Sequence, residues 1–111
     1  MKNKYCLALD IKNDPESIAA YDRYHENVWP EIKKSITDAG ILNMEIYRTG
    51  NRLFMIIDVE EGFSFERKAA LDGSNPKVQE WEDLMWNYLQ RLDPAAERGW
   101  VLMDRVFSLK D

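Results

Sequence analysis

The chain has a single histidine, His25, and the residues spaced around it are suited to acid–base chemistry. Tyr21 stands four residues before His25, and Trp29 stands four residues after it. On a helix these three side chains project from nearly one face. An imidazole with a pKa of about 6.5 can give or take a proton near neutral pH, and a phenol beside it can donate or accept a hydrogen bond. Spacing alone leaves two interpretations open: a proton-transfer site, or a half-buried histidine packed in the core.

A second group of aromatic side chains lies in a later segment, residues 76–92, which is predicted to be the longest helix. Trp81, Met85 and Tyr88 follow its apolar stripe, and Trp86 lies at the edge of that stripe. Indole faces commonly stack on the C–H face of a sugar or on another flat apolar ligand. Packing in the core is the preferred interpretation for Trp81 and Tyr88, whereas Trp86 is equally suited to the core and to a binding site.

Composition narrows the classes of function. The net charge is −5 and the 15 basic residues are scattered, so nucleic acid is not an expected partner. No apolar run approaches about 18 residues, and the N-terminus lacks a signal-like apolar stretch, so we expect a cytoplasmic protein outside the membrane. Cys6 is the only cysteine and is interpreted as a buried thiol. With no disulfide, no familiar zinc motif and no phosphate-binding loop, neither a metal nor an organic cofactor is expected.

Hydrophobic periodicity divides the chain into strands and helices that form a single domain, residues 1–111. Apolar alternation predicts strands at residues 4–11, 41–47, 52–60 and 100–109, and helical spacing predicts helices at residues 15–29, 31–38, 64–71 and 76–92. Asp14-Pro15 and Asn75-Pro76 are typical helix starts, with a break or kink expected at Pro30. This order predicts an α+β fold, the ferredoxin-like plait, with a four-stranded antiparallel sheet and helices on one face.

The opposite face of that sheet would be bare in a monomer. Both alternating faces of the strands carry many apolar side chains, such as Phe54 and Val106, which indicates a sheet covered on both sides. A second copy of the chain is the natural cover, so we expect a homodimer packed through its sheet faces, a dimeric α+β barrel.

Carboxylates in the middle of predicted strands need partners if they are buried. We expect structural ion pairs rather than a site role for these aspartates. The aspartates are Asp10, Asp58 and Asp104, and the possible partners are Arg23, Arg48, Arg52 and Arg105.

Four stretches of the chain together resemble the L-rhamnose mutarotase family. Residues 21–31 carry the specific pattern Tyr-x-x-x-His-x-x-x-Trp-Pro-Glu. Residues 40–47, 86–88 and 105–107 support the match, which extends over nearly the whole chain. The resemblance implies a dimeric ferredoxin-like enzyme without metal or organic cofactor that interconverts the α and β anomers of a 6-deoxyhexose, with L-rhamnose as the expected substrate.

The resemblance also implies roles for individual residues. His25 would be the catalytic proton donor, Tyr21 would contact the sugar and Trp86 would wall the pocket. Met44 and Met85 occupy substrate-binding positions where bacterial members carry a tyrosine and the first tryptophan of a pair. One hydrogen-bonding group and one stacking surface are therefore missing here or supplied from elsewhere.

Three other functions remain open at this point. The first is a mutarotase for L-fucose or another deoxysugar rather than L-rhamnose. The same plait also carries cofactor-independent monooxygenases and haem-degrading enzymes, an alternative that rests on fold analogy alone. Finally, the loss of a polar contact at Met44 is compatible with a sugar-binding module that lacks catalytic activity.

Overall fold

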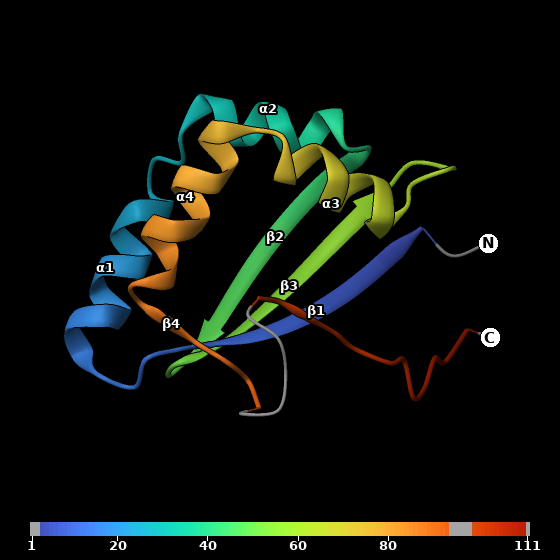
Figure 1. Ribbon diagram of the computed structural model, residues 1–111. Coiled ribbons are helices and arrows are strands. Elements are labelled where there is room, and N and C mark those ends of the chain that lie inside the picture. Colours follow the sequence, from blue (N-terminus) through green and yellow to red (C-terminus); the bar gives the residue numbers. More distant parts are fainter. Residues whose placement is uncertain (1–2, 94–98, 111) are drawn as a thin grey trace.

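The computed structural model describes residues 3–93 and 99–110, which form an antiparallel sheet with helices packed over one of its faces (Figure 1). The predicted α+β ferredoxin-like fold is confirmed. In chain order the elements are β1 (Lys4–Ile11), α1 (Pro15–His25), α2 (Pro30–Asp38), β2 (Ile41–Thr49), β3 (Arg52–Val59), α3 (Phe65–Gly73), α4 (Pro76–Trp86), β4 (Leu89–Gln90) and β5 (Val101–Leu102).

The sheet has the strand order β2-β3-β1-β4, and β5 also pairs with β1. Each pairing is antiparallel. Leu9 lies opposite Leu53 and Met44 opposite Ile57, so the apolar residues of each strand share the face beneath the helices. This alternation is the one expected from the sequence.

Side-chain caps fix where the helices begin. The Asp14 carboxylate accepts a hydrogen bond from the Ser17 backbone N–H at 2.8 Å, and Pro15 follows in the first turn of α1. Asn75 caps α4 in the same way, before Pro76. The interaction between Asp14 and Ser17 lowers the Asp14 pKa, since it favours the ionised carboxyl group.

Helix α1 ends at His25, four residues before the expected boundary at Trp29. Pro30 begins α2. A proline disfavours the helical conformation for the residue before it, so Trp29 is extended, with φ −55° and ψ 136°. Trp29 therefore leaves the helix face shared by Tyr21 and His25. Its ring packs instead against Trp81 of α4, with 5.0 Å between ring centroids.

The predicted extension of the longest helix to Leu92 is wrong. Helix α4 ends at Trp86, and the chain turns at once into β4 along the edge of β1. The backbone N–H of Lys12 donates to the Tyr88 carbonyl at 2.8 Å, and Leu89 is buried opposite Ile11. Pairing with this edge satisfies backbone groups and buries Leu89, which outweighs continued helical periodicity.

The predicted strand at residues 100–109 is reduced to β5, Val101–Leu102. Next to β5, the Met103 backbone N–H donates a hydrogen bond to the Cys6 carbonyl at 2.8 Å. Beyond it, Val106, Phe107 and Leu109 are 96%, 75% and 88% exposed. The two short strands β4 and β5 share the edge of β1. The alternating residues after Leu102 therefore have no strand to pair with among the described residues.

The core fills the space between the helices and the sheet. One cluster of buried side chains joins β1 and β3 to α1, α2 and α4; its members are Leu9, Ile11, Tyr21, Ile32, Leu53, Val78, Trp81, Met85 and Leu89. A second cluster lies toward the start of β2, with Leu7, Ile41, Met55, Ile57 and Val59. The first cluster anchors Tyr21, so the end of α1 is held firmly against the sheet.

The other face of the sheet carries two ion pairs. Arg52 binds the nearly buried Asp10 with two of its nitrogens, and Lys4 binds Asp58 at 3.5 Å. The mid-strand aspartates of β1 and β3 are therefore paired, as expected, although Asp58 has a lysine partner. Within the described residues, no helix combines the length and the apolar character needed to cross a membrane.

Candidate active site

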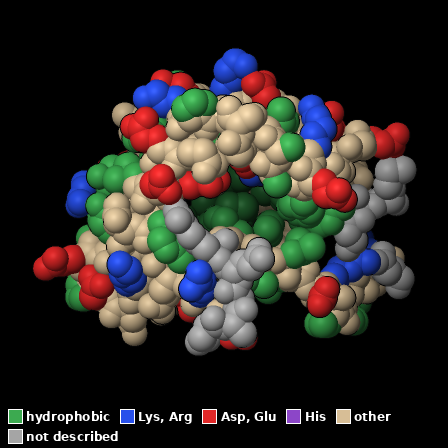
Figure 2. Space-filling model, viewed as in Figure 1, with side chains coloured by type: hydrophobic (Ala, Val, Ile, Leu, Met, Phe, Trp, Pro, Cys, Tyr) green, Lys and Arg blue, Asp and Glu red, His purple; other side chains and the backbone are tan. Residues whose placement is uncertain are grey.

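A cavity of about 270 Å³ lies between the end of α1 and the sheet. In the space-filling view, hydrophobic side chains lie in a hollow below the helices, and no histidine side chain is visible from this side (Figure 2). The cavity is lined by Tyr21, Asp22, His25 and Glu26 from α1, Ile46 and Arg48 from β2, and Leu53 from β3. It is therefore lined by both charged and apolar side chains.

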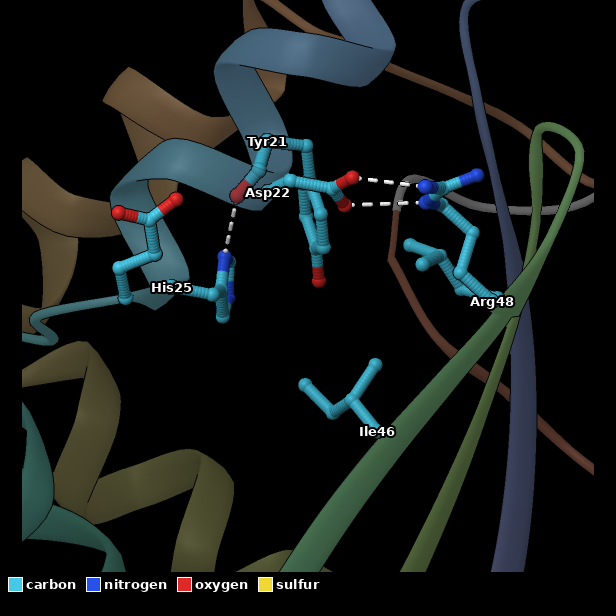
Figure 3. A pocket seen from close by; sticks show the side chains of 7 residues that line it. Tyr21, Asp22, His25, Ile46 and Arg48 are labelled. Atoms are coloured by element: carbon cyan, nitrogen blue, oxygen red, sulfur yellow. Dashed lines mark hydrogen bonds and ion pairs between the residues drawn. The ribbon is translucent and has the colours of Figure 1, made fainter.

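A backbone hydrogen bond fixes the orientation and the tautomer of His25. Its Nδ1 lies 2.8 Å from the Tyr21 carbonyl oxygen (Figure 3). Because a carbonyl can only accept, Nδ1 carries a proton and donates it, and Nε2 is the nitrogen that titrates. Burial lowers the pKa of His25, opposed by the Tyr21 carbonyl and by the charge of Asp22. At neutral pH the imidazole is mainly neutral, and its Nε2 can accept a proton.

Tyr21 stacks directly on the histidine ring. The two ring centroids are 4.1 Å apart and the planes are inclined by 24°. The Tyr21 phenol extends from α1 toward the sheet (Figure 3), and the residue is only 4% exposed. Burial raises the pKa of Tyr21, and the nearby Asp22 charge raises it further. The phenol thus keeps its proton near neutral pH and acts as a hydrogen-bonding hydroxyl.

Indole rings support the pair from the side of α4. Trp81 is buried and meets His25 edge to face, with 5.6 Å between centroids and 69° between planes. Trp29 also packs against the Trp81 indole, and the Lys77 ammonium lies 5.7 Å from the Trp29 ring centroid. Trp81 therefore holds the imidazole in place, as well as filling the core.

An ion pair closes the polar side of the cavity. The Arg48 guanidinium donates from Nε to Asp22 Oδ1 at 2.9 Å and from Nη2 to Asp22 Oδ2 at 2.7 Å (Figure 3). Its Nη1 donates to the Gly50 carbonyl at 2.8 Å. The Asp22 carboxylate raises the pKa of Arg48, so the guanidinium stays charged. The pair joins α1 to β2 across the rim of the site.

The structure brings together two of the five residues expected from the sequence. Tyr21 and His25 line the cavity. Met44 is half-buried against the second core cluster, Met85 is buried in the first, and Trp86 is half-buried beside the first. These three side chains are absent from the residues that line the cavity. Their assignment to sugar binding stays a prediction.

The sequence reasoning missed five lining residues: Asp22, Glu26, Ile46, Arg48 and Leu53. A signal for some of them was present. Strand alternation puts Ile46 and Arg48 on the face of β2 that the helices cover, in register with Leu53 and its neighbours on β3. The position of α1 above that face was not available from alternation.

The functional groups that line the cavity are hydroxyl, carboxylate, guanidinium and imidazole groups. In the described part of the chain, no three histidine, cysteine, aspartate or glutamate side chains are grouped as metal ligands. The lining residues combine a proton acceptor, hydrogen-bonding groups and an apolar wall. This arrangement suits a small neutral molecule with both hydroxyl groups and C–H surface.

Known proteins resemble the chain over nearly its full length. A family model described as L-rhamnose mutarotase matches residues 4–109. An L-fucose mutarotase from Xanthomonas campestris is 39% identical, covering 97% of this chain and 89% of that protein. An L-rhamnose mutarotase from Acidiphilium cryptum is 37% identical, covering 93% and 96%.

A solved structure supports the same fold. The L-rhamnose mutarotase FA22100 from Formosa agariphila superposes with a TM-score of 0.71 at 21% identity, over 97% of this chain and 99% of that one. Together with the family model, these similarities confirm the resemblance inferred from the sequence. The chain belongs to the L-rhamnose mutarotase family, a family of enzymes that interconvert the anomers of 6-deoxyhexose sugars.

Proposed function

We propose that this chain interconverts the α and β anomers of a 6-deoxyhexose, L-rhamnose or L-fucose, in the cavity beneath α1. The observation that carries the proposal is the stacked pair of Tyr21 and His25, whose Nδ1 is held by the Tyr21 carbonyl. This bond leaves the titrating Nε2 available in a cavity lined by both polar and apolar groups. The names of the relatives support both sugars, since they include an L-fucose and an L-rhamnose mutarotase.

Anomer exchange requires two proton transfers and one bond cleavage. The anomeric hydroxyl loses its proton, the ring oxygen gains one, and the bond between the anomeric carbon and the ring oxygen breaks. The open-chain aldehyde then rotates about the adjacent carbon–carbon bond and closes through the same steps in reverse. No bond to the protein is needed, so a positioned acid–base group is sufficient.

In this mechanism neutral His25 accepts the proton of the anomeric hydroxyl at Nε2 during ring opening. During closure the imidazolium returns the proton to the carbonyl oxygen, so His25 is also a donor, the role implied by the family resemblance. The Tyr21 hydroxyl donates a hydrogen bond to the sugar at the ring oxygen. The ring oxygen takes its proton from a water molecule, and the hydroxide that is left takes a proton back from this oxygen when the ring closes. The lowered pKa of His25 and the raised pKa of Tyr21 support this division of roles.

The direct test is the rate of anomer exchange, measured by NMR saturation transfer between the two anomeric protons. L-rhamnose and L-fucose are each incubated with and without the protein, in a buffer that is itself a poor proton-transfer catalyst. We expect exchange to accelerate in proportion to protein concentration for at least one of the two sugars. Exchange at the spontaneous rate with both sugars would refute the proposed activity.

We also infer that two copies pair through the sheet face opposite the helices. Cys6, Phe54 and Ile56 alternate onto that face and are half-buried. The apolar side chains of Val106 and Phe107, beyond β5, are 96% and 75% exposed. Apolar surface of this kind favours burial against a symmetric partner.

Light scattering during gel filtration tests the homodimer. The wild-type chain should have twice the mass of one chain, and Ile56→Glu should shift it to the monomer mass, because a buried unpaired carboxylate opposes association. Lys33→Glu on α2 is the control, since it adds a carboxylate at an exposed position on the helix side of the sheet and should leave the mass unchanged. A wild-type protein that stays monomeric at high concentration would rule out this pairing.

A further inference from the structure

We propose that the ion pair of Asp22 and Arg48 is the sugar-recognition element of the cavity and determines which arrangement of ring hydroxyls is accepted. The inference takes the class of ligand, a 6-deoxyhexose, from the proposed function. Both members of the pair line the cavity beside Tyr21 and His25. Among the ion pairs of the described residues, it is the one whose two members both line this cavity.

The geometry of the pair makes it rigid enough for recognition. Two parallel hydrogen bonds, of 2.9 and 2.7 Å, join the guanidinium to the carboxylate. A third, of 2.8 Å, ties Arg48 to the Gly50 carbonyl in the turn between β2 and β3. The guanidinium plane is therefore fixed by α1 on one side and by the turn on the other. Bidentate contacts of this kind add directional specificity as well as strength.

The pair retains unused hydrogen-bonding capacity. A guanidinium has five N–H donors, and three of those in Arg48 are used by Asp22 and Gly50 in the described part of the chain. Each Asp22 oxygen accepts one bond from Arg48 and has a further lone pair. The pair is also accessible, since the side chains of Arg48 and Asp22 are 33% and 46% exposed. Donors and acceptors thus remain side by side at the cavity rim.

This pattern is complementary to neighbouring hydroxyls of a sugar ring. Each hydroxyl both donates and accepts, so one can donate to the carboxylate while the next accepts from the guanidinium. Ile46 and Leu53, which lie beside Arg48 on the covered face of the sheet, are apolar and suit the methyl group and C–H face of a 6-deoxyhexose. A sugar with its hydroxyls turned the other way would leave the donors and acceptors of the pair unmatched, and such mismatches discriminate between substrates.

A purely structural role explains the pair less well. Ion pairs at this level of exposure add little to stability. The end of α1 is already held by the buried side chains of Ala20 and Tyr21. Loss of the pair should therefore leave the fold intact, while changing how the cavity binds its ligand.

The experiment compares Arg48→Met and Asp22→Asn with the wild-type protein. Arg48→Lys tests the fork geometry, because lysine keeps the charge without the bidentate contact. Lys34→Met is the control, since it removes an exposed ion pair with Asp38 on α2, away from the cavity. Binding of L-rhamnose and L-fucose, which differ in the orientation of two ring hydroxyls, is measured by NMR titration, and anomer exchange is measured separately.

We expect Arg48→Met and Asp22→Asn to weaken binding of the preferred sugar by about tenfold to a hundredfold, with a much smaller effect on the other sugar. The ratio of the anomer-exchange rate of the preferred sugar to that of the other sugar should fall in parallel. Arg48→Lys should recover only part of the loss, and Lys34→Met should match the wild type.

Two results would overturn the inference: unchanged binding, or an equal loss for both sugars, which marks a general structural effect. The binding measurement is independent of catalysis. If the wild-type protein binds a sugar without accelerating its anomer exchange, the proposed function fails while the recognition role is still decided by the variants. A wild-type protein that binds neither sugar would overturn the recognition role.

Discussion

Replacing His25 by glutamine removes the imidazole while keeping a side chain that can donate a hydrogen bond to the Tyr21 carbonyl. The change therefore separates proton transfer from positioning. Glutamine is uncharged over the accessible pH range and cannot exchange a proton as imidazole does. If His25 accepts and returns the anomeric proton, anomer exchange should slow by about a hundredfold to ten-thousandfold, the usual contribution of a general acid–base group.

The same substitution should have a modest effect on folding. The hydrogen bond from Nδ1 contributes about 1 kcal/mol, and the stack on Tyr21 about 0.5–1.5 kcal/mol. Their combined loss, at most about 3 kcal/mol, is smaller than the roughly 5–15 kcal/mol that stabilises a typical domain. The variant should therefore remain folded at 25 °C, and slower exchange would not be a consequence of unfolding.

Saturation transfer gives the exchange rate, and urea unfolding followed by circular dichroism gives the free energy of unfolding of the same samples. Tyr24→Phe is a matched control on α1, because Tyr24 neighbours His25 in sequence but does not line the cavity. It should keep the wild-type exchange rate. Exchange by folded His25→Gln within about threefold of the wild-type rate would refute the catalytic role of the imidazole.

Three further predictions concern pH and helix capping. Because the folded-state pKa of His25 is lowered, the rate of anomer exchange should rise with pH through an apparent pKa below 6.5, as a pH–rate profile would show. The free energy of unfolding should decrease as pH falls below the unfolded-state pKa of about 6.5, as urea midpoints measured across pH would show. Histidine NMR titration should show the His25 pKa lowered further in Asp22→Asn, which removes a negative charge, and raised in Arg48→Met, which removes a positive one. Asp14→Ala should lower the urea midpoint of unfolding, because the helix loses its cap, and leave exchange unaltered.

The parts of the fold that sequence reasoning captured are those set by local chemistry. The Asp14 cap, the proline starts of α1 and α4, and the alternation of β1, β2 and β3 depend on neighbouring residues. The end of α4 depends on a competition between helical periodicity and the free edge of β1. That competition is decided by the pairing of Leu89 with Ile11, which are far apart in sequence.

The site divides in the same way. Tyr21 and His25 are one helical turn apart, so their stacking follows from spacing once α1 forms. Asp22 and Arg48 are 26 residues apart and meet because α1 crosses the end of β2. Strand alternation could place Arg48 on the covered face of the sheet but could not identify the helix residue above it. The ion pair therefore required the tertiary structure.

Met44 and Arg48 together suggest how the polar contact expected at one position is supplied from another. Both lie on the helix-covered face of β2, with Ile46 between them. Met44 packs in the second core cluster, where its thioether is a poor hydrogen-bonding group, whereas Arg48 reaches the cavity and binds Asp22. If the pair recognises the sugar, the hydrogen-bonding group on this strand face is at position 48 rather than position 44, about 13 Å away, the rise of four residues. Specificity in this chain would then depend on the orientation of hydroxyls at the Arg48 end of the cavity, which the comparison of the two sugars measures directly.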